Sequence, residues 1–185
     1  IDGLVIDLRN NGGGSLQEAN SLVGLFIESG PTVQIRSSGG KVDTMRDNDP
    51  LMIYKGPMAV VVNRLSASAS EIFAGAIQDY RRGIIVGERT FGKGTVQSMQ
   101  PLDRGQLKIT LAKFYRISGE TNQHKGIIPD ITLPSLLDHE ELGESALPNA
   151  LPADTIRAAA YEKDRGLEAA LPWLRGRVLD YGCGL

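Results

Sequence analysis

The stretch Asn63-Arg-Leu-Ser-Ala-Ser-Ala-Ser-Glu-Ile72 is among the most informative parts of this chain. It follows an apolar run at residues 58–62, which has the length and β-branched content of a buried strand. The stretch leads into a run at residues 69–79 that reads as a helix. Small polar residues between the two runs are typical of a turn and of a helix N-cap. The sequence therefore predicts a strand, a tight turn that carries serines, and a helix.

On both sides of this stretch, short apolar runs alternate with helical ones, which predicts a layered α/β core. Ser15 is the expected N-cap of the first helix, and Asp154 that of the last. Residues 118–126 are polar and contain glycine, and we expect a loop there. The expected strands are residues 4–8, 32–36, 41–45, 58–62, 84–86, 95–102 and 106–116, and the expected helices are residues 16–28, 69–79 and 154–163.

Composition excludes several classes of protein. The 185 residues include 41% hydrophobic and 23% charged residues, as in an ordinary globular domain with a real core. The net charge of −2 does not indicate a basic surface for binding nucleic acid or an acidic membrane. A single cysteine, Cys183, excludes an internal disulfide framework and a multi-cysteine metal site. No apolar run approaches the roughly 20 residues that span a bilayer.

A serine needs a base within hydrogen-bond reach before it can act as a nucleophile at neutral pH. Neither His124 nor His139 lies in a recognisable catalytic context. Lys93 lies in the glycine-flanked stretch Phe91-Gly-Lys-Gly-Thr-Val-Gln97 and is the economical base. Its ordinary pKa is about 10.4, and burial in an apolar pocket without a carboxylate partner would lower that value.

The residues alone do not choose the nucleophile. Ser66, Ser68 and Ser70 are all small and close to the turn. Each hydroxyl would also fit a purely structural role as a turn former or an N-cap.

Four ordered blocks carry a family resemblance. They are Gly3-Leu-Val-Ile-Asp-Leu-Arg-Asn-Asn-Gly-Gly-Gly14, Ser66-Ala-Ser-Ala-Ser-Glu-Ile-Phe-Ala-Gly-Ala-Ile-Gln-Asp79, Gly87-Glu-Arg-Thr-Phe-Gly-Lys-Gly-Thr-Val-Gln97 and Lys125-Gly-Ile-Ile-Pro-Asp-Ile131. They resemble the signature blocks of the tail-specific, or C-terminal-processing, serine peptidases. The resemblance covers roughly residues 1–160, and it extends to the larger tail-specific branch. It implies a crotonase-like layered core of short strands with flanking helices.

The same resemblance implies roles for individual residues. Ser68 becomes the nucleophile and Lys93 the general base, and Gln97 would orient the lysine amine without adding a negative charge. The backbone amide of Ala69 becomes one oxyanion donor, and that of Gly13 or Gly14 becomes the other. The resemblance does not choose between the two glycines.

Two carboxylates, Glu71 and Asp79, also fall in family positions. A structural role is expected for both, because a carboxylate on Lys93 would keep that lysine charged. Glu71 suits the positive end of the helix dipole, and Asp79 is expected to anchor Arg81 and Arg82.

The resemblance implies a serine endopeptidase that needs no metal and no cofactor. Its substrates would be proteins recognised near an apolar C-terminal tail, in the periplasm or cell envelope of a bacterium. An adaptor or a membrane-associated lipoprotein would be a compatible partner, no nucleic acid is expected, and the oligomeric state is left open. The alternatives are a catalytically weak peptide-binding scaffold of the same fold and a crotonase-like acyl-CoA enzyme.

We expect residues 1–135 to form the Ser-Lys peptidase core and residues 136–165 an acidic, proline-punctuated arm with a short helix. The chain begins directly in a strand and reads as a piece of a longer protein, whose PDZ domain and helical region would precede Ile1. Residues 166–185 are an atypical tail, expected to be foreign or disordered. Within it, Val178-Leu-Asp-Tyr-Gly-Cys-Gly184 resembles the first glycine-rich motif of S-adenosylmethionine-dependent methyltransferases.

Overall fold

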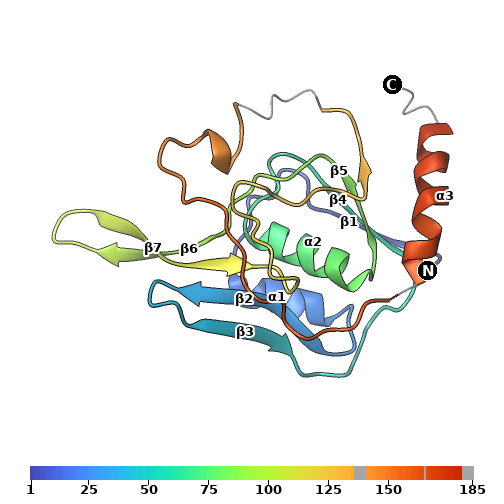
Figure 1. Cartoon of the computed structure of the whole chain (residues 1–185), viewed down its shortest axis with the longest axis horizontal. Helices are drawn as coiled ribbons and strands as arrows, with labels where there is room; N and C mark the ends of the chain where they lie inside the picture. The colour runs from blue at the N-terminus through green and yellow to red at the C-terminus, as the bar shows by residue number, and fades with distance from the viewer. Residues whose placement is uncertain (136–140, 165, 181–185) are drawn as a thin grey trace.

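Two four-stranded sheets form the body of the protein in the computed structural model, which describes residues 1–135, 141–164 and 166–180 (Figure 1). The first sheet is parallel, with the order β1-β4-β5-β8. The second sheet is antiparallel, with the order β3-β2-β7-β6. The strands are β1 (Leu4–Asp7), β2 (Gly30–Ser37), β3 (Val42–Asp47), β4 (Met58–Val62), β5 (Ile84–Gly87), β6 (Thr95–Pro101), β7 (Gln106–Tyr115) and β8 (Ile131–Thr132).

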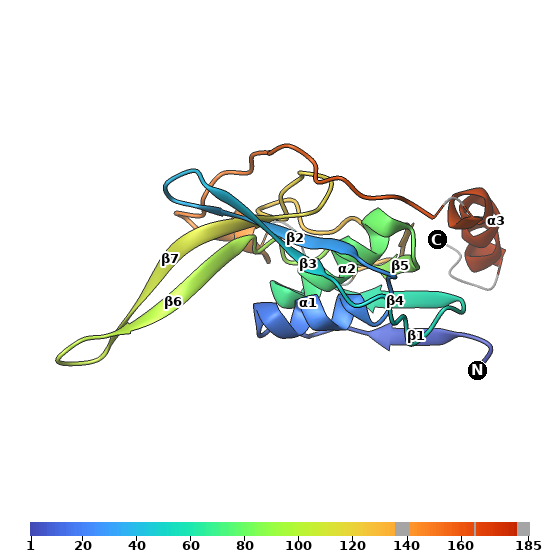
Figure 2. The ribbon, with the colours of Figure 1, turned by 90° about the horizontal axis from the view of Figure 1, so that it is seen from below.

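Helices α1 (Leu16–Gly24) and α2 (Ala69–Tyr80) lie between the two sheets (Figure 2). Helix α2 contacts β5 of the parallel sheet and β2 of the antiparallel sheet, so it is the centre of the layered structure. The α/β architecture predicted from the alternation of strands and helices is therefore confirmed.

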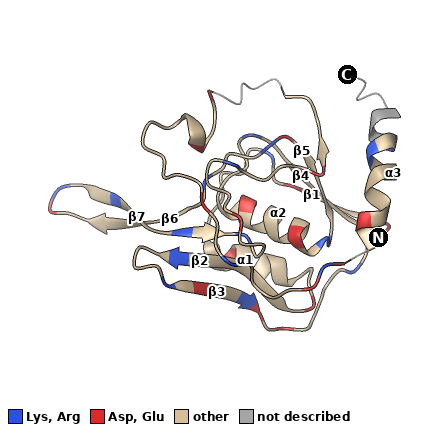
Figure 3. Ribbon diagram, viewed as in Figure 1, with Lys and Arg blue, Asp and Glu red and all other residues tan. Residues whose placement is uncertain are grey.

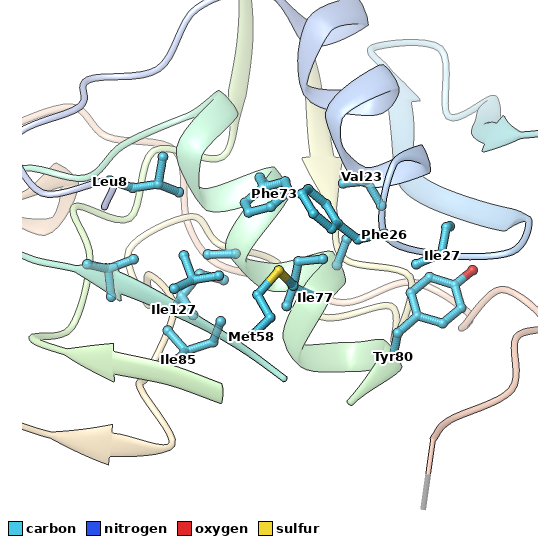
Figure 4. Packing of buried hydrophobic residues seen from close by; sticks show 14 of the residues in the cluster. Leu8, Val23, Phe26, Ile27, Met58, Phe73, Ile77, Tyr80, Ile85 and Ile127 are labelled. Atoms are coloured by element: carbon cyan, nitrogen blue, oxygen red, sulfur yellow. The ribbon is translucent and has the colours of Figure 1, made fainter. Parts of the chain in front are cut away.

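The core forms around α2 (Figure 4). Phe73 and Ile77 of this helix are almost fully buried and belong to one cluster with Ile85 of β5. The Phe73 ring meets Phe26 edge to face, with centroids 5.9 Å apart. Burial of each such side chain contributes about 1.5–3 kcal/mol, so these contacts fix the position from which α2 begins.

Helix α1 ends earlier than the sequence predicts. Ser15 caps it as expected, because its hydroxyl accepts a hydrogen bond from the amide of Glu18. The expected helix runs to residue 28, whereas the observed one stops at Gly24. The carbonyl of Leu25 accepts the amide of Ile53 at 2.9 Å, so the chain pairs with a neighbouring loop and does not continue the helix.

The expected helix at residues 154–163 is wrong, since this segment is extended in the structure. The carboxylate of Asp154 does not cap a helix and instead binds Arg36, Lys113 and Tyr115. The amides of Ile156 and Ala159 donate to carbonyls of residues 117–119, as in a short strand pairing. Tertiary partners thus override the local capping signal.

Two helical elements were not expected from the sequence. A 3₁₀ turn, η1, spans Glu144–Ala146, and helix α3 spans Gly166–Asp180. Helix α3 lies at the side of the body near the N-terminus (Figure 1), where the Arg175 guanidinium donates to the carbonyl of Asp130. The methyltransferase-like motif continues past residue 180, and most of it lies outside the described residues.

Candidate active site

Ser68 lies at the N-cap of α2, directly after the turn that follows β4. Its backbone has φ 57° and ψ −114°, which is a strained conformation for a residue with a side chain. Such strain typically costs about 1–3 kcal/mol and is found at functional sites. The side chain is only partly buried, at the positive end of the helix dipole.

The two neighbouring serines differ from Ser68 in their surroundings. The Ser66 hydroxyl is fully buried and donates to the carbonyl of Leu8 at 2.7 Å. The Ser70 hydroxyl is also buried and donates to the carbonyl of Asn11 at 3.0 Å. Both hydroxyls therefore tie the turn to the loop after β1.

Lys93 lies in the loop between β5 and β6, with its side chain half-buried. Burial lowers the pKa of the Lys93 amine from its ordinary value, and the nearby charge of Lys108 lowers it further. The carboxylates of Glu144 and Glu71 act in the opposite direction, and the net direction is downward. The surroundings of Lys93 therefore make its amine easier to deprotonate than that of an exposed lysine.

Glu71 joins the loop of Ser68 to that of Lys93. Its Oε2 atom accepts hydrogen bonds from the amide of Ser68 at 2.8 Å and from the amide of Lys93 at 2.9 Å. Its Oε1 atom accepts the hydroxyl of Thr90 at 2.5 Å and the amide of Gly92 at 2.7 Å. One carboxylate oxygen therefore brings the two predicted catalytic residues together.

The carboxyl group of Glu71 is fully buried. Burial raises its pKa to about 7, although the four hydrogen bonds that it accepts oppose the rise. Thr90 supplies one of these bonds, and the sequence analysis missed it. The pairing crosses from helix to loop, so no local signal could have found it.

Gly13 lies against the peptide that joins Ser68 to Ala69. Its φ is +99°, and a Cβ there would lie 2.6 Å from the carbonyl oxygen of Ala67 and 2.8 Å from the amide nitrogen of Ala69. Only glycine fits such an approach. The Gly13 amide donates to Oδ1 of Asn11 at 3.0 Å, whereas a Cβ on Gly14 would meet nothing within 4 Å.

Two predicted residues lie apart from this cluster. Gln97 is exposed on β6, and its amide donates to the hydroxyl of Thr110 at 3.3 Å. Asp79 lies near the far end of α2, about 16 Å beyond Ser68 at the rise of a helix. Figure 3 shows the two acidic positions of α2, Glu71 and Asp79, in red and separate from each other.

The prediction that Asp79 anchors Arg81 and Arg82 is wrong. Its carboxylate binds Arg116, with the shorter of two hydrogen bonds at 2.5 Å. Arg81 instead pairs with Asp130 at 3.1 Å, and Arg82 donates to the carbonyls of Phe26 and Tyr54.

The sequence model of "Peptidase family S41" matches residues 1–133 of this chain. The chain belongs to peptidase family S41. A second model, described as the C-terminal domain of tail specific protease, matches residues 137–179. This second match takes in most of residues 166–185, the stretch that the sequence had set apart as atypical.

Relatives within the S41 family are similar over most of this chain. A tail-specific protease of Haemophilus influenzae is 48% identical over 86% of the chain. A chloroplastic C-terminal processing peptidase of Tetradesmus obliquus is 38% identical over 72% of it. The solved structure of a photosystem II D1 C-terminal processing protease covers 75% of the chain with a TM-score of 0.67 and 38% identity, and 36% of that protein is covered. The chain spans only 24% of the Haemophilus protein and 29% of the Tetradesmus protein.

Two pockets are lined by residues close in sequence to Ser68 and Lys93. A cavity of about 160 Å³ beside Ala69 has an apolar lining that includes Leu8, Leu22 and Phe73. A second cavity of about 300 Å³ lies where the base of the β6–β7 hairpin meets residues 144–151, and Gln97 lines it.

Within the described residues, no group of three or more His, Cys, Asp or Glu side chains is arranged to hold a metal ion. None of the helices in that part of the chain combines the length and the apolar content that a membrane span requires.

Proposed function

We propose that this chain forms the catalytic core of a serine endopeptidase of the tail-specific type, with Ser68 as nucleophile and Lys93 as general base. The observation that carries the proposal is the shared carboxylate oxygen of Glu71, which holds the backbone of both residues. The environment of the serines supports Ser68, because the hydroxyls of Ser66 and Ser70 are buried and donate to carbonyls.

In the proposed mechanism, neutral Lys93 takes the proton of the Ser68 hydroxyl as its oxygen attacks the scissile carbonyl. The protonated lysine then donates to the leaving amine, and an acyl-enzyme remains on Ser68. Water attacks the acyl-enzyme, again with Lys93 as base, and releases the second product. The lowered pKa of Lys93 supports this role, since a charged amine cannot accept the proton.

The oxyanion would be held by the amides of Ala69 and Gly14. Gly14 is favoured over Gly13, because the Gly13 amide already donates to Asn11. Gly13 acts instead by allowing the loop to lie against the nucleophile peptide. Amides placed in this way are typically worth about 3–4 kcal/mol of transition-state stabilisation.

Two roles of Gln97 fit this scheme, and they predict different kinetics. An orienting role requires its amide to leave Thr110 and turn toward the lysine amine. Its position on the lining of the larger cavity equally fits contact with substrate. In the first case Gln97→Ala lowers the rate of serine acylation, and in the second it raises KM alone.

The substrates would be proteins, cleaved after recognition of an apolar C-terminal tail. The similar proteins named as tail-specific and C-terminal processing peptidases support this class of substrate. We place the activity in the periplasm or cell envelope, with an adaptor or a membrane-associated lipoprotein as a compatible partner. The Haemophilus and Bartonella relatives are bacterial, which is in line with that location.

Labelling with a fluorophosphonate probe, followed by peptide mass spectrometry, tests the proposal. We expect stoichiometric labelling at Ser68, lost in Ser68→Ala and in Lys93→Ala. Ser70→Ala is the matched control and should still be labelled at Ser68. A folded full-length protein that is never labelled at Ser68 would favour the peptide-binding scaffold, and turnover of an acyl-CoA without peptide cleavage would favour the crotonase-like alternative.

A further inference from the structure

The Lys93 loop has a second set of hydrogen bonds besides those to Glu71. Gln123 has a fully buried side chain, and its Oε1 atom accepts the amide of Gly94 at 2.8 Å. The two residues are packed closely, since a Cβ on Gly94 would lie 2.7 Å from the Gln123 nitrogen. The next residue, His124, donates its amide to the carbonyl of Gly92 at 2.9 Å. Residues 123–124 therefore hold the loop on both sides of the lysine.

The other end of the Gln123 amide reaches the arm that follows the peptidase core. Its Nε2 atom donates to Oε1 of Glu144 and to the carbonyl of Leu151, both at 3.0 Å. The Glu144 amide in turn donates to the carbonyl of Phe91 at 3.0 Å, so the arm also touches the Lys93 loop directly. These arm residues lie within the segment matched by the tail-specific C-terminal domain.

Buried Arg64 reinforces this connection. Its guanidinium donates to the carbonyl of Leu142 at 2.7 Å and to that of Thr90 at 2.5 Å. Arg64 thus joins the arm, at Leu142, to Thr90 just before the loop that carries Lys93.

We propose that Gln123 is a positioning residue for Lys93, which couples the loop of the base to residues 142–151 of the C-terminal segment. This inference rests on the proposed role of Lys93 as general base. Lys93 has glycine on either side, and glycine gives the backbone wide conformational freedom. A misplacement of about 1 Å can cost on the order of 100-fold in rate, so a loop of this kind needs external support.

Gln34 provides a matched control within the same protein. It is also a buried glutamine, and its amide donates to the carbonyls of Arg116 at 3.1 Å and Arg157 at 3.2 Å. One of these carbonyls likewise belongs to the C-terminal segment. Gln34 therefore resembles Gln123 in its burial and in the two carbonyl or carboxylate acceptors of its Nε2 atom, but these two bonds do not involve the lysine loop.

The test compares Gln123→Ala with Gln34→Ala in the full-length protein. The rate of fluorophosphonate labelling at Ser68, kcat and KM for a peptide with an apolar C-terminus, and the unfolding midpoint are measured for each. Both variants should lose similar stability. Gln123→Ala should lose at least about tenfold in labelling rate and kcat with KM within about twofold, while Gln34→Ala stays within about twofold in both rates.

An exchange of the paired side chains separates positioning from simple loss of packing. Gln123→Glu alone places two carboxylates together and should slow labelling. Adding Glu144→Gln restores a carboxylate–amide pair with the donor on the other residue, while the Leu151 carbonyl loses its donor. Labelling should therefore recover part of the lost rate. Equal labelling rates in Gln123→Ala and Gln34→Ala, or no recovery in the exchanged pair, would overturn the role of Gln123. A wild-type protein that is not labelled at Ser68 would overturn the proposed function together with it.

Discussion

The two ends of α2 each hold a buried carboxylate, and the two carboxylates have opposite surroundings. Glu71 accepts three backbone amides and one hydroxyl, and none of these donors is charged. Asp79 instead binds the guanidinium of Arg116. The first arrangement fastens two loops together beside a lysine, and the second fastens the helix to the end of β7. A carboxylate that binds only neutral donors can therefore organise a site without pairing with its base.

The largest effect is expected for Glu71→Ala. The change leaves several buried donors without an acceptor, which would cost roughly 3–5 kcal/mol of unfolding free energy. It would also release the loops of Ser68 and Lys93 from each other, so labelling at Ser68 should fall by at least about 100-fold. Urea unfolding and labelling kinetics measure the two effects. A Glu71→Ala protein that keeps the wild-type labelling rate would show that Glu71 does not organise the loops of Ser68 and Lys93.

Asp79→Ala should affect stability alone. It leaves the Arg116 guanidinium buried without its counter-charge, which would cost about 3 kcal/mol. The labelling rate of the folded fraction should stay within about twofold of the wild-type rate. A slow rate in a fully folded Asp79→Ala protein would mean that both ends of the helix serve the active site.

The pH dependence of stability offers a finer test of Glu71. Its pKa is raised to about 7 in the folded protein, so the folded state retains a proton that the unfolded chain loses near its ordinary value. Folding then takes up a proton, and this contribution to stability is lost as the pH rises toward 7. The loss amounts to about 2–3 kcal/mol between pH 4.5 and 8. Glu71→Gln should flatten this part of the stability profile, and an unchanged slope would exclude Glu71 as its source.

The smallest effect is expected for Lys108→Gln. The charge of Lys108 lowers the pKa of Lys93, so its removal should raise that pKa. The acid limb of the pH–rate profile for labelling would then move to higher pH, with little change in the plateau. The profile is measured with the fluorophosphonate probe at low salt, and a shift toward lower pH would contradict the assigned direction.

Most of the fold could be predicted from the sequence where the signals are local. The strand–turn–helix unit around Ser68 is observed, because the apolar strand, the small turn residues and the helical run that begins at Ala69 agree with one another. Residues 154–163 misled the prediction, because Asp154 has a capping side chain but three long-range partners.

The sequence by itself determined the family, the layered α/β class and the two loops on which Ser68 and Lys93 lie. These features depend on local periodicity, turn chemistry and motif order, which are all written along the chain. The family resemblance selected Ser68 among the three serines, and the tertiary structure added that the hydroxyls of Ser66 and Ser70 are buried and donate to carbonyls. The tertiary structure also gave Gln97 and Asp79 hydrogen-bond partners outside the Glu71 cluster. It showed as well that Glu71 and Gln123 both hold the lysine loop. Burial and hydrogen-bond partners depend on residues far apart in the chain, so no local pattern encodes them.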